Sequence, residues 1–197
     1  MSRQIAVYKQ VKKTQPQQVA VIGLRVPKSF FITSGCGESD NQEHAGSYHI
    51  ALERAGISKC NIMVYSSVMP KIAQEIEKTP QLLQQLPHGG VMETIMAHGR
   101  GGSGVRATAG IIYGWLYDEN GERQGGLVCE YSGNDTEEKA KDILKKSLVE
   151  VHQNGFKNLK LDDINLITES FVPKKKFGSA LVSICFTDYE VPILSMT

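Results

Sequence analysis

Net charge, cysteine and long hydrophobic runs are all scarce in this chain of 197 residues. The formal charge is only +1, so the composition does not predict nucleic acid or an anionic membrane surface as a partner. No apolar run reaches the roughly 20 residues that span a bilayer. The chain begins with polar and basic residues instead of the apolar core of a signal peptide. We therefore expect a cytoplasmic protein without a membrane partner.

Metal and disulfide sites are not expected either. The four cysteines are Cys36, Cys60, Cys129 and Cys185. They lie far apart and show no C-x-x-C spacing, which argues against a structural zinc ion, a redox pair or a disulfide framework. They are predicted to be small buried residues in a reducing compartment. His44 and His49 could suggest a metal, but their i, i+5 spacing puts them on different faces of a helix.

Length and composition predict one domain with a substantial core. Hydrophobic residues make up 41% of the chain and charged residues 22%, which is ordinary for a globular protein. Residues 1–18 are polar and basic, and we expect them to form a flexible or loosely docked arm. Residues 19–197 are then expected to form the domain itself.

Most of the periodic segments predict strands. Apolar, β-favouring runs predict strands at 19–26, 30–33, 61–65, 91–97, 107–117, 126–131, 156–168 and 178–186. The glycines at 35–37 predict a turn. Those at 99–104 lack the ending of a phosphate-binding loop and predict a flexible loop near a subunit interface. Residues 118–121 predict a hairpin-type turn, and the lysines at 174–176 predict a solvated turn before a strand.

Two segments have helical spacing. Residues 44–55 and 136–153 repeat apolar positions at helical intervals, each has a glycine just beyond its end, and Thr136 can serve as an N-cap. Residues 71–86, interrupted by Pro80, predict a short helix or an irregular loop. Runs of strands with only two good helices favour an α+β fold over an alternating α/β fold.

The most informative pattern is the serine pair Ser66-Ser67, inside the run from Asn61 to Pro70. Adjacent serines by themselves are typical of a turn at a strand end. Here the pair follows an apolar, β-favouring stretch and precedes a proline, beside a peptide bond that the fold could hold rigid. The Ser67 hydroxyl could attack the carbonyl of Ser66, convert the amide into an ester and, after β-elimination, leave a pyruvoyl group.

Two other polar residues interrupt apolar strands. Glu130 follows the run Leu127 to Cys129, so its carboxyl could be partly desolvated and hold a proton near neutral pH. A place on the outward face of the strand fits the pattern equally well. Asn61 opens the strand before the serine pair, where its amide could steady a developing oxyanion or simply begin the strand.

Four blocks, in order along the chain, resemble the pyruvoyl-dependent arginine decarboxylases, and specifically the bacterial branch of that family. The blocks are 35–40, 55–70, 126–131 and 175–181. Each block alone would be weak evidence, whereas four in the family's order are a strong signal. The resemblance covers residues 24–190 and leaves the N-terminal arm outside it.

The resemblance implies a four-layer αββα sandwich that assembles as a trimer, with active sites between neighbouring protomers. Self-cleavage would leave a β chain, 1–66, and an α chain, 67–197, headed by a covalent pyruvoyl group derived from Ser67. The amino group of the substrate would form a Schiff base with that group before carbon dioxide leaves. In the same pattern Glu130 is the general acid, and Asn61 orients the scissile region and the substrate.

The small-molecule substrate that the resemblance implies is L-arginine, which would be converted to agmatine. The residues expected to bind it are Glu38, Asp40, His49 and Leu52. His49 departs from the family pattern, in which many members carry an acidic residue that helps bind the guanidinium group. An imidazole lacks the bidentate acceptor geometry that a guanidinium prefers. Either Glu38 or Asp40 supplies that acceptor, or the substrate is another amino acid.

A third possibility is a non-catalytic relative that stays in one piece and serves as an oligomeric scaffold. A scaffold has no need of Asn61, Ser67 and Glu130 together. Their joint presence therefore favours the enzyme.

Overall fold

The structure of the protein is a computed structural model that describes residues 20–196, which fall into two compact units. Of the described residues, 20–25 and 191–196 belong to the smaller unit, and the larger unit is Val26–Glu190. The arm expected at 1–18 lies outside the described residues.

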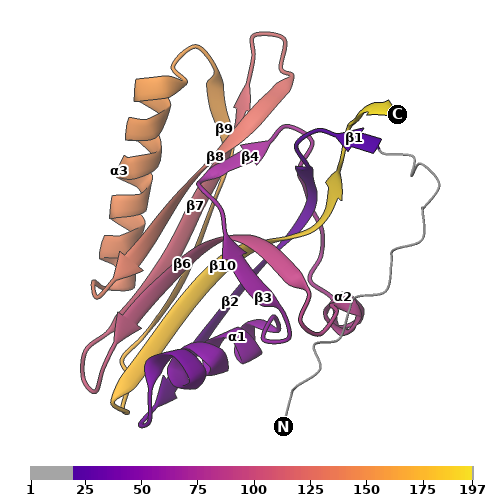
Figure 1. The fold of residues 1–197 in the computed structure, drawn as a ribbon. Helices are drawn as coiled ribbons and strands as arrows, with labels where there is room; N and C mark the ends of the chain where they lie inside the picture. Colours follow the sequence, from indigo (N-terminus) through magenta and orange to yellow (C-terminus); the bar gives the residue numbers. More distant parts are fainter. Residues whose placement is uncertain (1–19, 197) are drawn as a thin grey trace, which may run out of the picture. The chain divides into compact units, whose positions relative to one another are not determined.

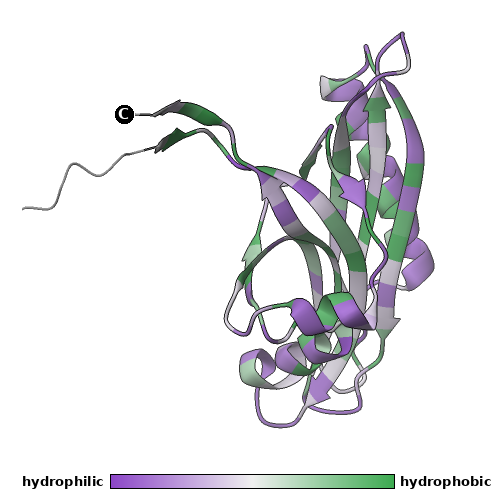
Figure 2. Ribbon diagram, turned by 90° about the vertical axis from the view of Figure 1, so that its right-hand side faces the viewer, coloured by the Kyte–Doolittle hydropathy of each residue, from purple (hydrophilic) through white to green (hydrophobic). Residues whose placement is uncertain are grey.

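The smaller unit contains a two-stranded antiparallel ribbon. β1, Ala20–Ile22, pairs with β11, Ile193–Met196, and the N–H of Gly23 donates to the carbonyl of Pro192 at 2.7 Å. The strands of the ribbon are coloured as hydrophobic in Figure 2, and their large apolar side chains are exposed. The single strand predicted at 19–26 is wrong in its length. β1 ends at Ile22, and the next strand begins only at Val26.

Two sheets form the larger unit (Figure 1). The five-stranded sheet has the order β3-β6-β10-β2-β5. Its strands are β2 (Val26–Ser39), β3 (Asn61–Val64), β5 (Gln74–Glu75), β6 (Val91–Gly101) and β10 (Phe177–Glu190). The four-stranded sheet has the order β4-β8-β7-β9. Its strands are β4 (Val68–Pro70), β7 (Ala107–Tyr117), β8 (Arg123–Gly133) and β9 (Lys160–Phe171).

The larger unit is layered in the order helix, sheet, sheet, helix. Apolar side chains such as Phe30 and Ile111 fill the core between the two sheets. A π-helix, η1 (Glu43–Tyr48), and α1 (His49–Ala55) pack on the outer face of the five-stranded sheet. α3 (Glu137–Gly155) packs on the outer face of the four-stranded sheet (Figure 1). The expected α+β class is confirmed, and the order of the layers is compatible with a four-layer sandwich.

β7 illustrates how the sequence encodes these layers. All of its residues but the last are buried. Ile111 and Tyr113 contribute to the core between the sheets, whereas Ile112 and Leu116 pack with α3. A strand covered on both faces is apolar throughout. The strand predicted at 107–117 is therefore confirmed at both ends.

The glycine-rich stretches lie mainly in strands. Gly35 and Gly37 lie inside β2, where an added Cβ would come within 2.3 Å of backbone oxygens in α1 and η1. Gly99 lies inside β6, where a Cβ would come within 2.0 Å of the carbonyl oxygen of Thr108 on the other sheet. The predicted turn at the first stretch is wrong, and so is the start of the predicted loop at the second. The glycines there allow one backbone to pack directly on another.

The helices lie close to their predicted positions. η1 and α1 together cover the helix predicted at 44–55, and Gly56 ends it in the left-handed conformation, with φ of 82°. Thr136 caps α3 by accepting an N–H of the first turn. Pro80 starts α2 (Pro80–Gln85) instead of interrupting a helix, because the first helical residue needs no N–H donor. Among residues 20–196, no helix is both long and apolar enough to cross a membrane.

Candidate active site

The serine pair lies where the chain passes from one sheet to the other (Figure 1). Before the pair, β3 pairs with β6 in the five-stranded sheet, and the N–H of Tyr65 extends this pairing by donating to the carbonyl of Thr94 at 2.7 Å. After the pair, Val68 begins β4 and pairs with Leu127 of β8 in the four-stranded sheet. Both sides of the Ser66-Ser67 peptide bond are therefore anchored, each in a different sheet.

Backbone hydrogen bonds fix the two carbonyl groups of the serine pair. The N–H of Val68 donates to the Ser66 carbonyl at 2.9 Å, which closes a three-residue turn around Ser67. The N–H of Val128 on β8 donates to the Ser67 carbonyl at 3.1 Å. A donor on the Ser66 carbonyl polarises the carbon that a nucleophile would attack, and it would stabilise negative charge on the oxygen.

The side chain of Ser67 is hydrogen-bonded to Glu130. Its Oγ donates to the carboxylate of Glu130, with distances of 2.6 Å to Oε1 and 2.8 Å to Oε2. Glu130 is half-buried, and it shares its face of β8 with Val128, which packs in the core between the sheets. The structure thus brings together two residues that are 63 positions apart and that the sequence predicts as catalytic.

Cys129, the neighbour of Glu130, does not compete as a nucleophile. Burial of the thiol, with a smaller contribution from the Glu130 charge, raises the pKa of Cys129 to about 11. The thiol therefore stays protonated at neutral pH, and a protonated thiol is a poor nucleophile. The described cysteines are all free: Cys129 and Cys185 are buried as predicted, whereas Cys36 and Cys60 are only partly buried.

Asn61 serves a different part of the site. It is the first residue of β3, where its Nδ2 donates to the Gly89 carbonyl at 2.9 Å and its N–H donates to the Gly90 carbonyl at 2.8 Å. These bonds hold the turn that precedes β6. Among the described residues, the Asn61 amide makes no hydrogen bond to Ser66 or Ser67.

A hollow of about 350 Å³ collects three of the predicted site residues, namely His49, Leu52 and Asn61. Its complete lining is His44, Tyr48, His49, Leu52, Ser58, Cys60, Asn61 and Ile62. Neither Ser67 nor Glu130 belongs to this lining, which also contains no carboxylate. Within one chain, the hollow and the Ser67–Glu130 pair are therefore separate features.

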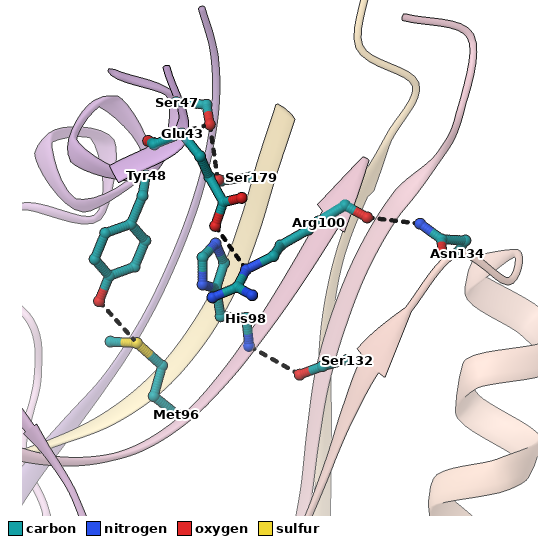
Figure 3. Close-up of polar contacts among 9 residues, drawn as sticks. All are labelled: Glu43, Ser47, Tyr48, Met96, His98, Arg100, Ser132, Asn134 and Ser179. Carbon is teal, nitrogen blue, oxygen red and sulfur yellow. Dashed lines mark hydrogen bonds and ion pairs between the residues drawn. The ribbon is translucent and has the colours of Figure 1, made fainter. Parts of the chain in front are cut away.

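Tyr48 forms a wall of the hollow and is held by a network that the sequence did not indicate (Figure 3). Its ring centroid lies 4.5 Å from that of His98 and 5.7 Å from that of His44, and its hydroxyl donates to Met96 Sδ at 3.6 Å. Burial, followed by the charge of Arg100, lowers the pKa of His98 to about 4. The imidazole is therefore neutral at physiological pH and packs as an aromatic ring.

The same network connects the two sheets. The N–H of His98 on β6 donates to the hydroxyl of Ser132 on β8 at 3.0 Å, two residues beyond Glu130 (Figure 3). Arg100 pairs with Glu43 of η1 at 2.7 Å. These residues are scattered over three elements, and no local pattern in the sequence marks them as a group.

Glu38 and Asp40 lie elsewhere. Glu38 accepts the N–H groups of Lys174, at 2.7 Å, and of Lys175, whereas Asp40 accepts the N–H of Lys176. The bond from Lys174 is the main reason why the pKa of Glu38 is lowered. Both carboxylates thus hold the turn before β10, and the structure does not bring them to the hollow around His49.

Known proteins are similar to this chain in sequence. The family model described as pyruvoyl-dependent arginine decarboxylase matches residues 29–191. A pyruvoyl-dependent arginine decarboxylase of Chlamydia abortus is 35% identical over 187 residues, which cover 85% of this chain and 94% of the relative. One from Chlamydia caviae is equally similar by these measures. One from Pyrococcus abyssi is 30% identical, with 83% of this chain and 97% of the relative covered.

The fold and the site define an α+β protein that holds a serine hydroxyl on a carboxylate, beside a peptide bond anchored at both ends. The chain belongs to the pyruvoyl-dependent arginine decarboxylase family, because the family model covers most of its length. Relatives with this name are carboxy-lyases, and they include the bacterial ones that the resemblance predicted.

Proposed function

We propose that this protein is a self-processing, pyruvoyl-dependent decarboxylase that converts L-arginine to agmatine and carbon dioxide. The observation that carries the proposal is the Ser67 hydroxyl at 2.6 Å from the Glu130 carboxylate, next to a Ser66 carbonyl that accepts an N–H. Membership of the family and the names of the relatives support the reaction and the substrate.

In the first step of processing, Ser67 Oγ attacks the Ser66 carbonyl carbon while Glu130 accepts the hydroxyl proton. The N–H of Val68 stabilises the oxyanion, and cleavage of the carbon–nitrogen bond turns the amide into an ester. Loss of the Ser67 α-proton then expels the Ser66 carboxylate, and water replaces the resulting enamine nitrogen to release ammonia. The products are a β chain, 1–66, and an α chain, 67–197, with a pyruvoyl group at its start.

Ser67 and Glu130 fit a pyruvoyl group at position 67. The hydroxyl that would generate the group and the carboxylate that would face it are already in contact. The pyruvoyl carbonyl supplies the electron sink for decarboxylation. Glu130 is placed to deliver a proton to the substrate α-carbon once carbon dioxide has left. Asn61 and Leu52 would help position the substrate from the hollow.

We further propose that neighbouring copies complete one another's sites in a trimer. The hollow and the Ser67–Glu130 pair are separate within one chain. Large apolar side chains on both sides of the serine pair are exposed, with values of 51% for Met63, 61% for Val64 and 60% for Val68. Exposed apolar groups clustered beside a site favour burial against another copy of the chain.

The test compares the two serines. Ser67→Ala should remain one intact chain without agmatine production, because it lacks the attacking hydroxyl. Ser66→Ala is the matched control, and it should still cleave because its carbonyl remains. Denaturing mass measurement and agmatine assay give both readouts. An active Ser67→Ala variant would overturn the mechanism, and an intact, inactive wild-type chain would favour the scaffold.

The same chemistry on another amino acid is the second candidate, and the hollow supports it. A buried guanidinium needs an anionic partner, yet the lining offers two histidines and no carboxylate. Rates on arginine, lysine, ornithine, histidine and aspartate would separate the candidates. If the substrate is not arginine, His49→Asp should raise kcat/KM for arginine by about tenfold or more. A wild-type preference for arginine that this variant leaves unchanged would eliminate the second candidate.

A further inference from the structure

We infer that Arg123 is a positioning residue, which holds the start of the cleaved α chain so that the group at position 67 stays against Glu130. The inference rests on the proposed function, because it concerns the chain end that self-cleavage creates. Arg123 is the first residue of β8, the strand that also carries Glu130. Its own side chain is not in contact with the serine pair.

The guanidinium of Arg123 holds two carbonyl groups that follow β4. Its Nε donates to the Lys71 carbonyl at 2.8 Å, and its Nη2 donates to the Ala73 carbonyl at 2.8 Å. Its Cζ lies 4.1 Å from the ring centroid of Trp115, which is itself buried in the core. The planar guanidinium, stacked on an aromatic ring, presents its donors in a fixed geometry.

The strand that this clamp supports is short, and of its three side chains only that of Met69 is buried in the core between the sheets. β4 has only three residues and pairs with Leu127, Gly126 and Gly125 of β8. The last residue of β4 is Pro70, which has no N–H to contribute to the pairing. Two of its three partners are glycines, which add no side-chain packing across the strands.

Cleavage changes what holds this strand. In the intact chain, the segment before Ser67 is anchored on β6, so position 67 is held from both directions. After cleavage the same position begins a chain, and chain ends fray unless they are tied down. Beyond Arg123, the chain is held by the buried side chain of Ala73, by the pairing of β5 with β2, and by the Tyr113 hydroxyl on Glu75 at 2.8 Å. Within the stretch between β4 and β5, Arg123 supplies the two side-chain hydrogen bonds to Lys71 and Ala73.

Removal of the clamp should lower the rate of substrate turnover without reducing the extent of self-cleavage. Arg123→Gln should still cleave to completion, because cleavage starts from the intact, doubly anchored chain. Its kcat, expressed per pyruvoyl group, should fall about tenfold, since a small displacement of a reacting group is costly. KM should change by less than about twofold, because the hollow at α1 does not contact Arg123.

The experiment uses purified wild type, Arg123→Gln and Arg123→Lys. Intact mass reports cleavage, titration with a carbonyl reagent counts pyruvoyl groups, and steady-state rates give kcat and KM. Amide exchange of the peptide 67–75 in the cleaved protein should be faster in Arg123→Gln, and Arg123→Lys should restore part of kcat. A global loss of stability would speed exchange throughout the chain and not selectively in this peptide, and it would not lower kcat per pyruvoyl group while leaving KM unchanged.

Arg54→Gln is the matched control, because Arg54 also donates to a backbone carbonyl, that of Cys36 at 2.8 Å, on the other sheet. It should keep wild-type kcat and wild-type exchange at 67–75. An unchanged kcat per pyruvoyl group in Arg123→Gln, or an equal loss in Arg54→Gln, would overturn the inference alone. A wild-type chain that never cleaves would overturn the proposed function, and the inference with it.

Discussion

Two regions of the chain differ in how complete they are. The assembled part is the serine pair with Glu130, and the open part is the hollow around His49. The Ser67 hydroxyl, the Glu130 carboxylate and the N–H on the Ser66 carbonyl are already in contact. The hollow around His49 is open, lacks a carboxylate and does not include the serine pair. The first step of the proposed function therefore needs only groups from one chain, whereas the proposed binding of arginine requires an anionic group that the lining of this hollow lacks.

The largest expected effect comes from the assembled part. Glu130→Gln should slow self-cleavage by about a hundredfold or more, because an amide can accept the Ser67 hydrogen bond but cannot take its proton. A time course of intact mass measures the rate. Glu169→Gln is the matched control, since the Glu169 carboxylate also accepts a serine hydroxyl, that of Ser34, at 2.9 Å. Equal slowing in both variants would contradict a specific role for Glu130.

The next effect should fall on the open part. Gly37→Ala places a Cβ 2.3 Å from the Ser47 carbonyl oxygen, so η1 and α1 must move away from β2. We expect a loss of about 1–3 kcal/mol in the free energy of unfolding, as for overpacked cores, together with a raised KM. Gly155→Ala, where an added Cβ meets nothing within 4 Å, is the control and should not be destabilised. Denaturant unfolding and steady-state rates distinguish the two variants.

A smaller effect is expected where the two parts are linked. Ser132→Ala removes the acceptor of the His98 N–H, which connects β6 to β8 near Glu130. Because this hydrogen bond is exposed, the loss in unfolding free energy should be below about 1 kcal/mol. A loss much larger than this in denaturant unfolding would show that the link carries more of the structure than a single bond.

A separate expected effect is a pH dependence of stability, which arises from His98 behind the hollow. The pKa of His98 is lowered from 6.5 to about 4 in the folded chain, so the unfolded chain binds this proton more readily. At a pH above 6.5, the pKa of His98 in the unfolded chain, this imidazole costs no folding stability. The free energy of unfolding then decreases as pH falls from 6.5 toward 4. Glu43, His44 and Arg100 also influence this imidazole.

Thermal unfolding at several pH values checks that dependence. His98→Phe keeps an aromatic ring beside Tyr48 but has no titrating group, so its melting temperature should fall less than that of wild type as pH decreases. Melting temperatures that fall equally with pH in the two proteins would show that His98 does not cause the pH dependence.

The sequence predicts the assembled part better than the open part. β7 was predicted at both ends because burial on both faces leaves an apolar run. Ser67 and Glu130 each end or interrupt such a run, but it is the resemblance to the family that marks them as catalytic. By contrast, the turn predicted at the glycines of β2 is wrong. These residues are glycines because α1 and η1 pack directly on their backbone. The ring contact of Tyr48 with His98 joins separate elements and leaves no local pattern.

The central claim is that the chain cuts itself between Ser66 and Ser67, and denaturing intact-mass measurement of freshly purified wild-type protein tests it most directly. The account predicts two chains that separate after residue 66, with the larger one blocked to Edman sequencing and reactive toward carbonyl reagents. A single chain of full mass that persists through long incubation would contradict it.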